Sequence, residues 1–125
     1  MTITDLKPEL IWGIFHEITQ VPRPSKKEEK IREYLLDFAK KHGIEAKTDA
    51  IGNVAMRVPA TPGKENIPTV VMQSHMDMVP NQTKPETHNF ETDPIMTEVD
   101  GEWLHSAGYK TTLGADMQRI GNGPV

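Results

Sequence analysis

The chain has 125 residues, a net charge of −4 and a pI near 5.7. This length suits one modest domain with its own core, and the acidic balance argues against a nucleic-acid partner. No apolar run approaches the roughly 20 residues of a membrane span, and the first residues lack the basic and apolar regions of a signal peptide. Because cysteine is absent, any metal must be held by imidazole and carboxylate. The composition therefore predicts a cytoplasmic protein that does not act at a membrane.

Two amphipathic helices are predicted first. Residues 8–18 carry apolar side chains at helical spacing. Ser25, with Glu28 three residues later, predicts a capping box for a second helix over residues 26–42. Gly43 then suits the position just after the helix end. The apolar positions are Leu10, Ile11, Ile14, Phe15 and Ile18 in the first helix, and Ile31, Leu35, Phe38 and Ala39 in the second.

The strands follow. Residues 44–48 and 54–58 read as a hairpin around a turn at 51–53, and residues 59–68 as a polar loop. An apolar run from Thr69 predicts a strand buried on both faces. Short strands over 95–98 and 102–104 flank a turn at Asp100-Gly101. The fold class is therefore α/β, with two helices followed by a mixed sheet.

The candidate site lies where the run from Thr69 turns polar. His75 and Asp77 are two residues apart, so in an extended chain their side chains face the same side. Ligands of open α/β sheets bind at the carboxyl ends of strands. His75 could ligate a metal, and Asp77 could orient the imidazole. Asp116, after Gly114 and Ala115, could bridge two metal ions. A His-x-Asp pair alone also fits a hydrogen-bonded surface pair.

The remaining histidines and the two tryptophans have simpler explanations. His16 suits a partly packed helix position, and His42 a favourable cation at a helix end. His88 and His105 lie in irregular sequence without a definite role. Trp12 and Trp103 are interpreted as packing residues.

Several motifs resemble bacterial aminoacyl-histidine dipeptidases, which are Xaa-His dipeptidases within a larger co-catalytic zinc peptidase family. That larger family includes tripeptidase T and carboxypeptidase G. The resemblance covers nearly everything up to Asp116, with its motifs in the same order. They are residues 21–29 (VPRPSKKEE), 49–54 (DAIGNV), 74–79 (SHMDMV), 90, 93–95, 100–104 (DGEWL) and 111–116 (TTLGAD).

The resemblance implies an α/β catalytic domain with two Zn²⁺ ions, which Co²⁺ or Mn²⁺ could replace, and a dipeptide substrate. By position, His75 matches the first zinc ligand and Asp77 the catalytic carboxylate that orients it. Asp116 matches the carboxylate that bridges the metals. The family reaction is metal-assisted peptide hydrolysis, in which a glutamate takes the proton of the attacking water.

The sequence also departs from the family. Residues 1–116 are expected to be the N-terminal portion of the catalytic domain, whereas residues 117–125 form a tail that does not match. A frameshift would explain this tail. Permissible codons for residues 118–125, read one nucleotide out of frame, can encode Asn-Gly-Leu-Ala-Met-Ala-Leu, which resembles the family sequence after Gly-Ala-Asp. The catalytic glutamate, the other zinc ligands and the lid or dimerisation domain are expected beyond Val125.

The sequence thus predicts part of a zinc Xaa-His dipeptidase that is inactive by itself. Exposed apolar surface is expected to cause dimerisation or self-association. Two alternatives stay open. One is a non-catalytic binding or regulatory module that pairs with a full-length subunit. The other is a broader-specificity aminopeptidase or deacylase of the same zinc family.

Overall fold

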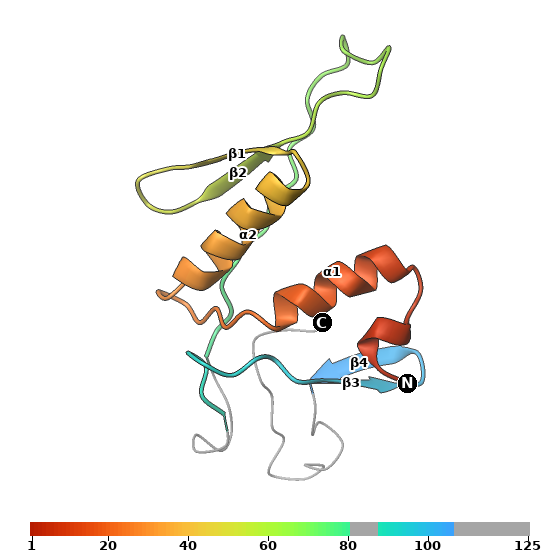
Figure 1. The fold of residues 1–125 in the computed structure, drawn as a ribbon, viewed down its shortest axis with the longest axis vertical. Coiled ribbons are helices and arrows are strands. Elements are labelled where there is room, and N and C mark those ends of the chain that lie inside the picture. Colours follow the sequence, from red (N-terminus) through yellow and green to blue (C-terminus); the bar gives the residue numbers. More distant parts are fainter. Residues whose placement is uncertain (81–87, 107–125) are drawn as a thin grey trace. The chain divides into compact units, whose positions relative to one another are not determined.

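The computed structural model describes residues 1–80 and 88–106 (Figure 1). These residues form two compact units, which are considered separately. The first contains residues 1–31 together with the described residues from Asp77 onward, and the second contains Arg32–Met76. Asp116 and the tail 117–125 lie outside the described residues. No helix in the described ranges has the length and apolar character needed to cross a membrane.

The first unit contains a short 3-10 helix, one α-helix and one hairpin. η1 (Ile3–Asp5) contacts both α1 (Glu9–Thr19) and β3 (Thr97–Asp100). β3 pairs antiparallel with β4 (Trp103–Ser106), with Asp100 opposite Trp103 (Figure 1). Gly101 takes a φ of +60° in the turn, as the predicted Asp100-Gly101 turn requires. The predictions of the first helix and of this hairpin are confirmed.

The apolar stripe of α1 is only partly covered. Ile14, Phe15 and Ile18 are half-buried, but Leu10 is 73% exposed and Ile11 is 62% exposed. Trp12 is half-buried and its ring lies 6.0 Å from that of Phe15 in an edge-to-face arrangement, which agrees with a packing role. Trp103 is 70% exposed, so its interpretation as a packing residue is wrong within the described residues.

The second helix, α2 (Glu29–Lys41), starts later than predicted. Lys26 has a φ of +71°, which is incompatible with a helical position, and its N–H donates to the Glu28 carboxylate at 2.5 Å. The capping box at Ser25 is therefore wrong. The end of the helix is as predicted: the N–H of Gly43 donates to Lys40 at 3.2 Å, and that of Ile44 to Ala39 at 2.8 Å. These two bonds form a Schellman cap.

The second unit continues with a hairpin. β1 (Glu45–Thr48) pairs antiparallel with β2 (Val54–Arg57), with Thr48 opposite Val54. The α/β fold class is confirmed. Pairing within each hairpin is antiparallel, and the parallel pairing among the described residues is an isolated bridge, Pro24 with Met78.

The buried strand predicted from Thr69 is not formed. Val70 and Val71 are each 83% exposed, and Met72 is 93% exposed. A strand becomes buried only when neighbouring strands pair with its edges and other elements cover its faces. No described residue supplies such a partner for residues 69–74, so the run has strand composition without strand structure.

Candidate active site

The carboxylate of Asp77 is held by a residue far away in the sequence. Ser25 Oγ donates a hydrogen bond to Asp77 Oδ2 at 2.5 Å, and both side chains are half-buried in the first unit. This length is typical of a hydroxyl bound to an ionised carboxylate, which is among the stronger hydrogen bonds in proteins. The Asp77 carboxylate is thus held by a hydrogen bond from a residue 52 positions away in the sequence.

The backbone around Asp77 is fixed as well. The N–H of Met78 donates to the carbonyl of Arg23 at 2.9 Å, and the N–H of Ser25 donates to the carbonyl of Met78 at 3.1 Å. These bonds form the parallel bridge between Pro24 and Met78. They set the register between residues 23–25 and residues 77–78, so the Ser25 hydroxyl lies beside the Asp77 carboxylate.

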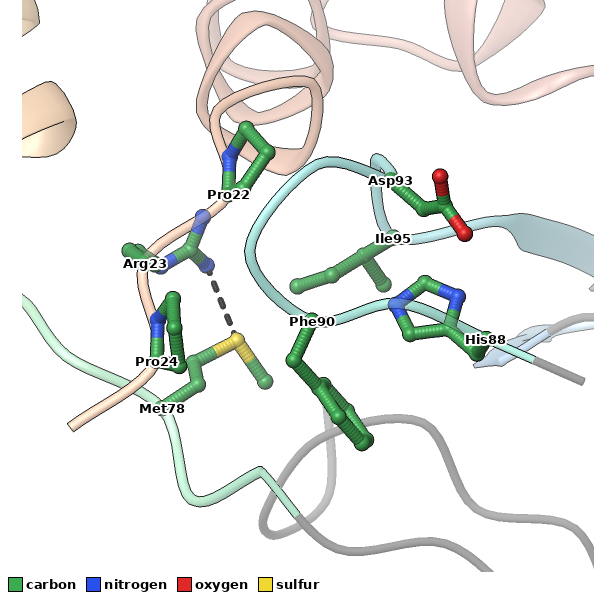
Figure 2. Close-up of a pocket in the computed structure, with 8 residues that line it drawn as sticks. All are labelled: Pro22, Arg23, Pro24, Met78, His88, Phe90, Asp93 and Ile95. Atoms are coloured by element: carbon green, nitrogen blue, oxygen red, sulfur yellow. Dashed lines mark hydrogen bonds between the residues drawn. The ribbon is translucent and has the colours of Figure 1, made fainter. Parts of the chain in front are cut away.

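Arg23 supports the same bridge. Its guanidinium donates to the carbonyl of Ile18 at the end of α1, and its Nη2 lies 3.1 Å from the sulfur of Met78 (Figure 2). Burial lowers the pKa of Arg23, yet a guanidinium stays charged at neutral pH. Arg23 therefore connects the helix end to the segment that carries Asp77.

A small cavity borders this bridge. Its volume is about 20 Å³, enough for roughly one water and far below the several hundred Å³ of a ligand pocket. Figure 2 shows His88 and Phe90 at its edge, with ring centroids 4.8 Å apart in an edge-to-face arrangement. The cavity is a packing feature and not a dipeptide pocket. It is lined by Pro22, Arg23, Pro24, Met78, His88, Phe90, Asp93 and Ile95.

The other proposed site residues are placed as follows. His75 belongs to the second unit and has an exposed side chain, whereas Asp77 belongs to the first. Whether the two face one site, as the two-residue spacing predicts, stays a prediction. Asp116 lies outside the described residues. Within residues 1–80 and 88–106 no three histidine or acidic side chains are grouped as a metal site requires.

The remaining histidines have varied surroundings. The ring of His42 lies 4.3 Å from that of Phe38, just beyond the end of α2, which agrees with a helix-end role. His16 is half-buried, and its Nδ1 is buried without a hydrogen-bond partner among the described residues. His105 lies in β4 and is half-buried. None of these histidines belongs to a group that could hold a metal ion within the described part of the chain.

Sequence reasoning missed Ser25 and Arg23 as parts of the site. The local sequence predicts a helix cap at Ser25, because a serine followed by glutamate three residues later is a common capping pattern. Its actual acceptor is 52 residues away. The available signal was that both residues lie in one of the motifs shared with the dipeptidases, residues 21–29.

The α/β fold of the chain matches that of a peptidase domain, and the similar proteins are dipeptidases. The chain is 44% identical over 114 residues to the cytosol non-specific dipeptidase of Escherichia coli K12. It also matches the crystal structure of aminoacylhistidine dipeptidase from Vibrio alginolyticus, with a TM-score of 0.80 and 42% identity. No protein-family model matches. The resemblance to aminoacyl-histidine dipeptidases is confirmed.

The alignments cover most of this chain but a small part of each relative. The two alignments include 91% and 93% of this chain but only 23% of each dipeptidase. The chain therefore spans about a quarter of the length of the relatives it matches. Most of each relative has no counterpart in this sequence.

Proposed function

We propose that this chain is a segment of the catalytic domain of a cytoplasmic, metal-dependent dipeptidase that prefers Xaa-His substrates. The observation that carries the proposal is the match to the Vibrio enzyme over 93% of the chain, at 42% identity and a TM-score of 0.80. Agreement of both sequence and fold over this length favours a shared site chemistry. The printed name of the Escherichia coli relative, a cytosol dipeptidase, supports the cellular location.

The proposed roles follow the motif positions. His75 and Asp116 would hold zinc, and Asp77 would orient the His75 imidazole. The exposed side chain of His75 and the anchored carboxylate of Asp77 fit these roles. When bound, zinc would polarise the peptide carbonyl. Since each zinc takes about four donors and no described trio supplies them, metal binding by this chain alone should be weak.

Two observations favour the alternatives. The exposed run at Val70–Met72 suits a non-catalytic module that pairs with a full-length subunit. The word "non-specific" in the name of the Escherichia coli relative suits a broader range of substrates. Both alternatives keep the catalytic-domain origin of the chain and differ in what it does.

A histidine-resolved zinc titration tests the proposed site. The five imidazoles of the chain are followed by NMR as Zn²⁺ is added, together with hydrolysis of an Xaa-His dipeptide. We expect weak binding that perturbs His75 first, is lost in His75→Ala and persists in His42→Ala. We expect no turnover. Equal perturbation of all histidines, or unchanged binding in His75→Ala, would refute the assignment of His75.

A further inference from the structure

We infer that Ser25 is a positioning residue, which fixes the carboxylate of Asp77, the group that is proposed to orient the imidazole of His75. The inference rests on the proposed function, in which Asp77 orients the ligating imidazole. It adds a residue that neither the motif spacing nor the local sequence assigns to the site. The observation behind it is the Ser25 Oγ to Asp77 Oδ2 hydrogen bond of 2.5 Å.

The physical need for such a residue comes from the rotation of a carboxylate. The terminal torsion of aspartate is broad and roughly two-fold, so packing alone sets it poorly. A short hydrogen bond to one oxygen fixes the plane of the group and thereby the direction of the other oxygen. A partner that orients a ligating imidazole must itself be oriented, and loss of such supporting contacts weakens metal binding.

The surroundings of Ser25 indicate that its hydroxyl serves this purpose. The N–H of Ser25 donates to the carbonyl of Met78, and the adjacent Pro24 is buried. These contacts fix the backbone of Ser25, so its side chain lies beside Asp77. The hydroxyl also lies 3.4 Å from the Met78 carbonyl, a longer contact than the one to Asp77. α2 begins only at Glu29, so the hydroxyl does not cap the helix.

A merely structural bond would stabilise the first unit without influencing a metal at His75. The two cases separate in a double-mutant cycle. Zinc affinity is measured on the whole chain from the His75 resonance, for wild type, Ser25→Ala, Asp77→Ala and the double variant. Ser25→Thr keeps a hydroxyl and tests rescue, and Ser106→Ala in β4 is the matched serine control. Urea unfolding of each variant reports folding separately.

If Ser25 positions the Asp77 carboxylate, Ser25→Ala weakens zinc binding by about tenfold, whereas Ser25→Thr and Ser106→Ala bind zinc like wild type. Zinc affinity then falls no further when Ser25→Ala is added to Asp77→Ala. If Ser25→Ala fails to fold, Ser25→Cys, with its weaker donor, should show the same loss of affinity.

Other outcomes overturn the inference in distinguishable ways. Wild-type affinity in folded Ser25→Ala refutes the role of Ser25 and leaves the zinc assignment intact. The same holds if Ser25→Ala weakens binding equally with and without the Asp77 carboxylate. If zinc does not perturb His75 in the wild-type chain, the proposed site fails and the inference fails with it.

Discussion

Arg32 Nε donates a hydrogen bond to the carbonyl oxygen of Gly52 at 2.9 Å, which ties α2 to the turn of the β1–β2 hairpin. Gly52 has a φ of +102°. A Cβ added there would lie 2.5 Å from Arg32 Cζ, so the glycine provides both the backbone conformation and the space for the guanidinium.

We expect Gly52→Ala to destabilise the chain by more than about 1 kcal/mol, because it adds backbone strain and displaces Arg32. Gly63→Ala is the matched control: Gly63 has a φ of +83° but no atom within 4 Å of its Cβ position. Urea unfolding measures both variants. Equal losses would mean that the Arg32 contact contributes nothing.

Asp49 organises the same turn from its other side. Its carboxylate accepts from the Asn53 amide at 2.7 Å, and from the backbone N–H groups of Asn53, Gly52 and Ile51 at 2.9, 2.8 and 3.0 Å. The side-chain bond from Asn53, followed by the backbone bonds, lowers the pKa of Asp49. The ionised form is therefore favoured by folding.

Because the folded-state pKa lies below the unfolded one, this stabilisation should be fully present above the unfolded value of about 4. It should be lost as the pH falls through the folded value. The difference in urea midpoint between wild type and Asp49→Asn, followed from neutral pH to below pH 4, isolates the effect. A difference that stays constant across this range would contradict it.

Thr19 is buried at the end of α1, with 2% of its surface exposed. Its hydroxyl donates to the carbonyl of His16 at 2.6 Å and accepts from the side chain of Gln20 at 3.1 Å. Thr19→Val keeps the shape and removes both bonds, so we expect a loss of about 1 kcal/mol in urea unfolding. Thr48→Val, at an exposed position of β1, should be nearly neutral. A neutral Thr19→Val would show that neither bond contributes.

The uncharged run 69–74 should drive self-association. Its backbone is unpaired among the described residues and its valines are exposed, which is the character of an edge open to pairing with another chain. We expect Val71→Lys to increase the monomer fraction in sedimentation velocity. Val58→Lys, at a site 73% exposed, should do so less. A wild-type sedimentation coefficient that does not change with concentration would contradict this prediction.

The structural predictions that are confirmed rest on patterns within short stretches of sequence. The Gly43 cap and both hairpins depend on residues within a few positions of one another, so their physics is visible in the sequence. The failures are non-local. The Ser25 hydroxyl donates to the distant Asp77 carboxylate and does not cap a helix. The run from Thr69 is exposed because no described strand pairs with it.

The site shows the same division. The spacing of His75 and Asp77 identified both residues as candidates from sequence, and Asp116 was identified by its Gly-Ala-Asp context. The shared motif 21–29 marks Ser25 and Arg23 as a pair of interest, but their contacts with Asp77 and Met78 depend on a parallel bridge across more than 50 residues, which no local pattern predicts. The roles of the three candidate residues stay predictions.

The most direct measurement concerns catalysis by a chimera. Residues 1–116 replace the matching segment of the Vibrio alginolyticus dipeptidase, and release of histidine from an Xaa-His dipeptide is followed. We expect an active chimera, a loss of activity of at least about tenfold in its His75→Ala form, and retained activity in its His42→Ala form. A folded but inactive chimera, or full activity without His75, would contradict the claim that this chain is a catalytic segment of such an enzyme.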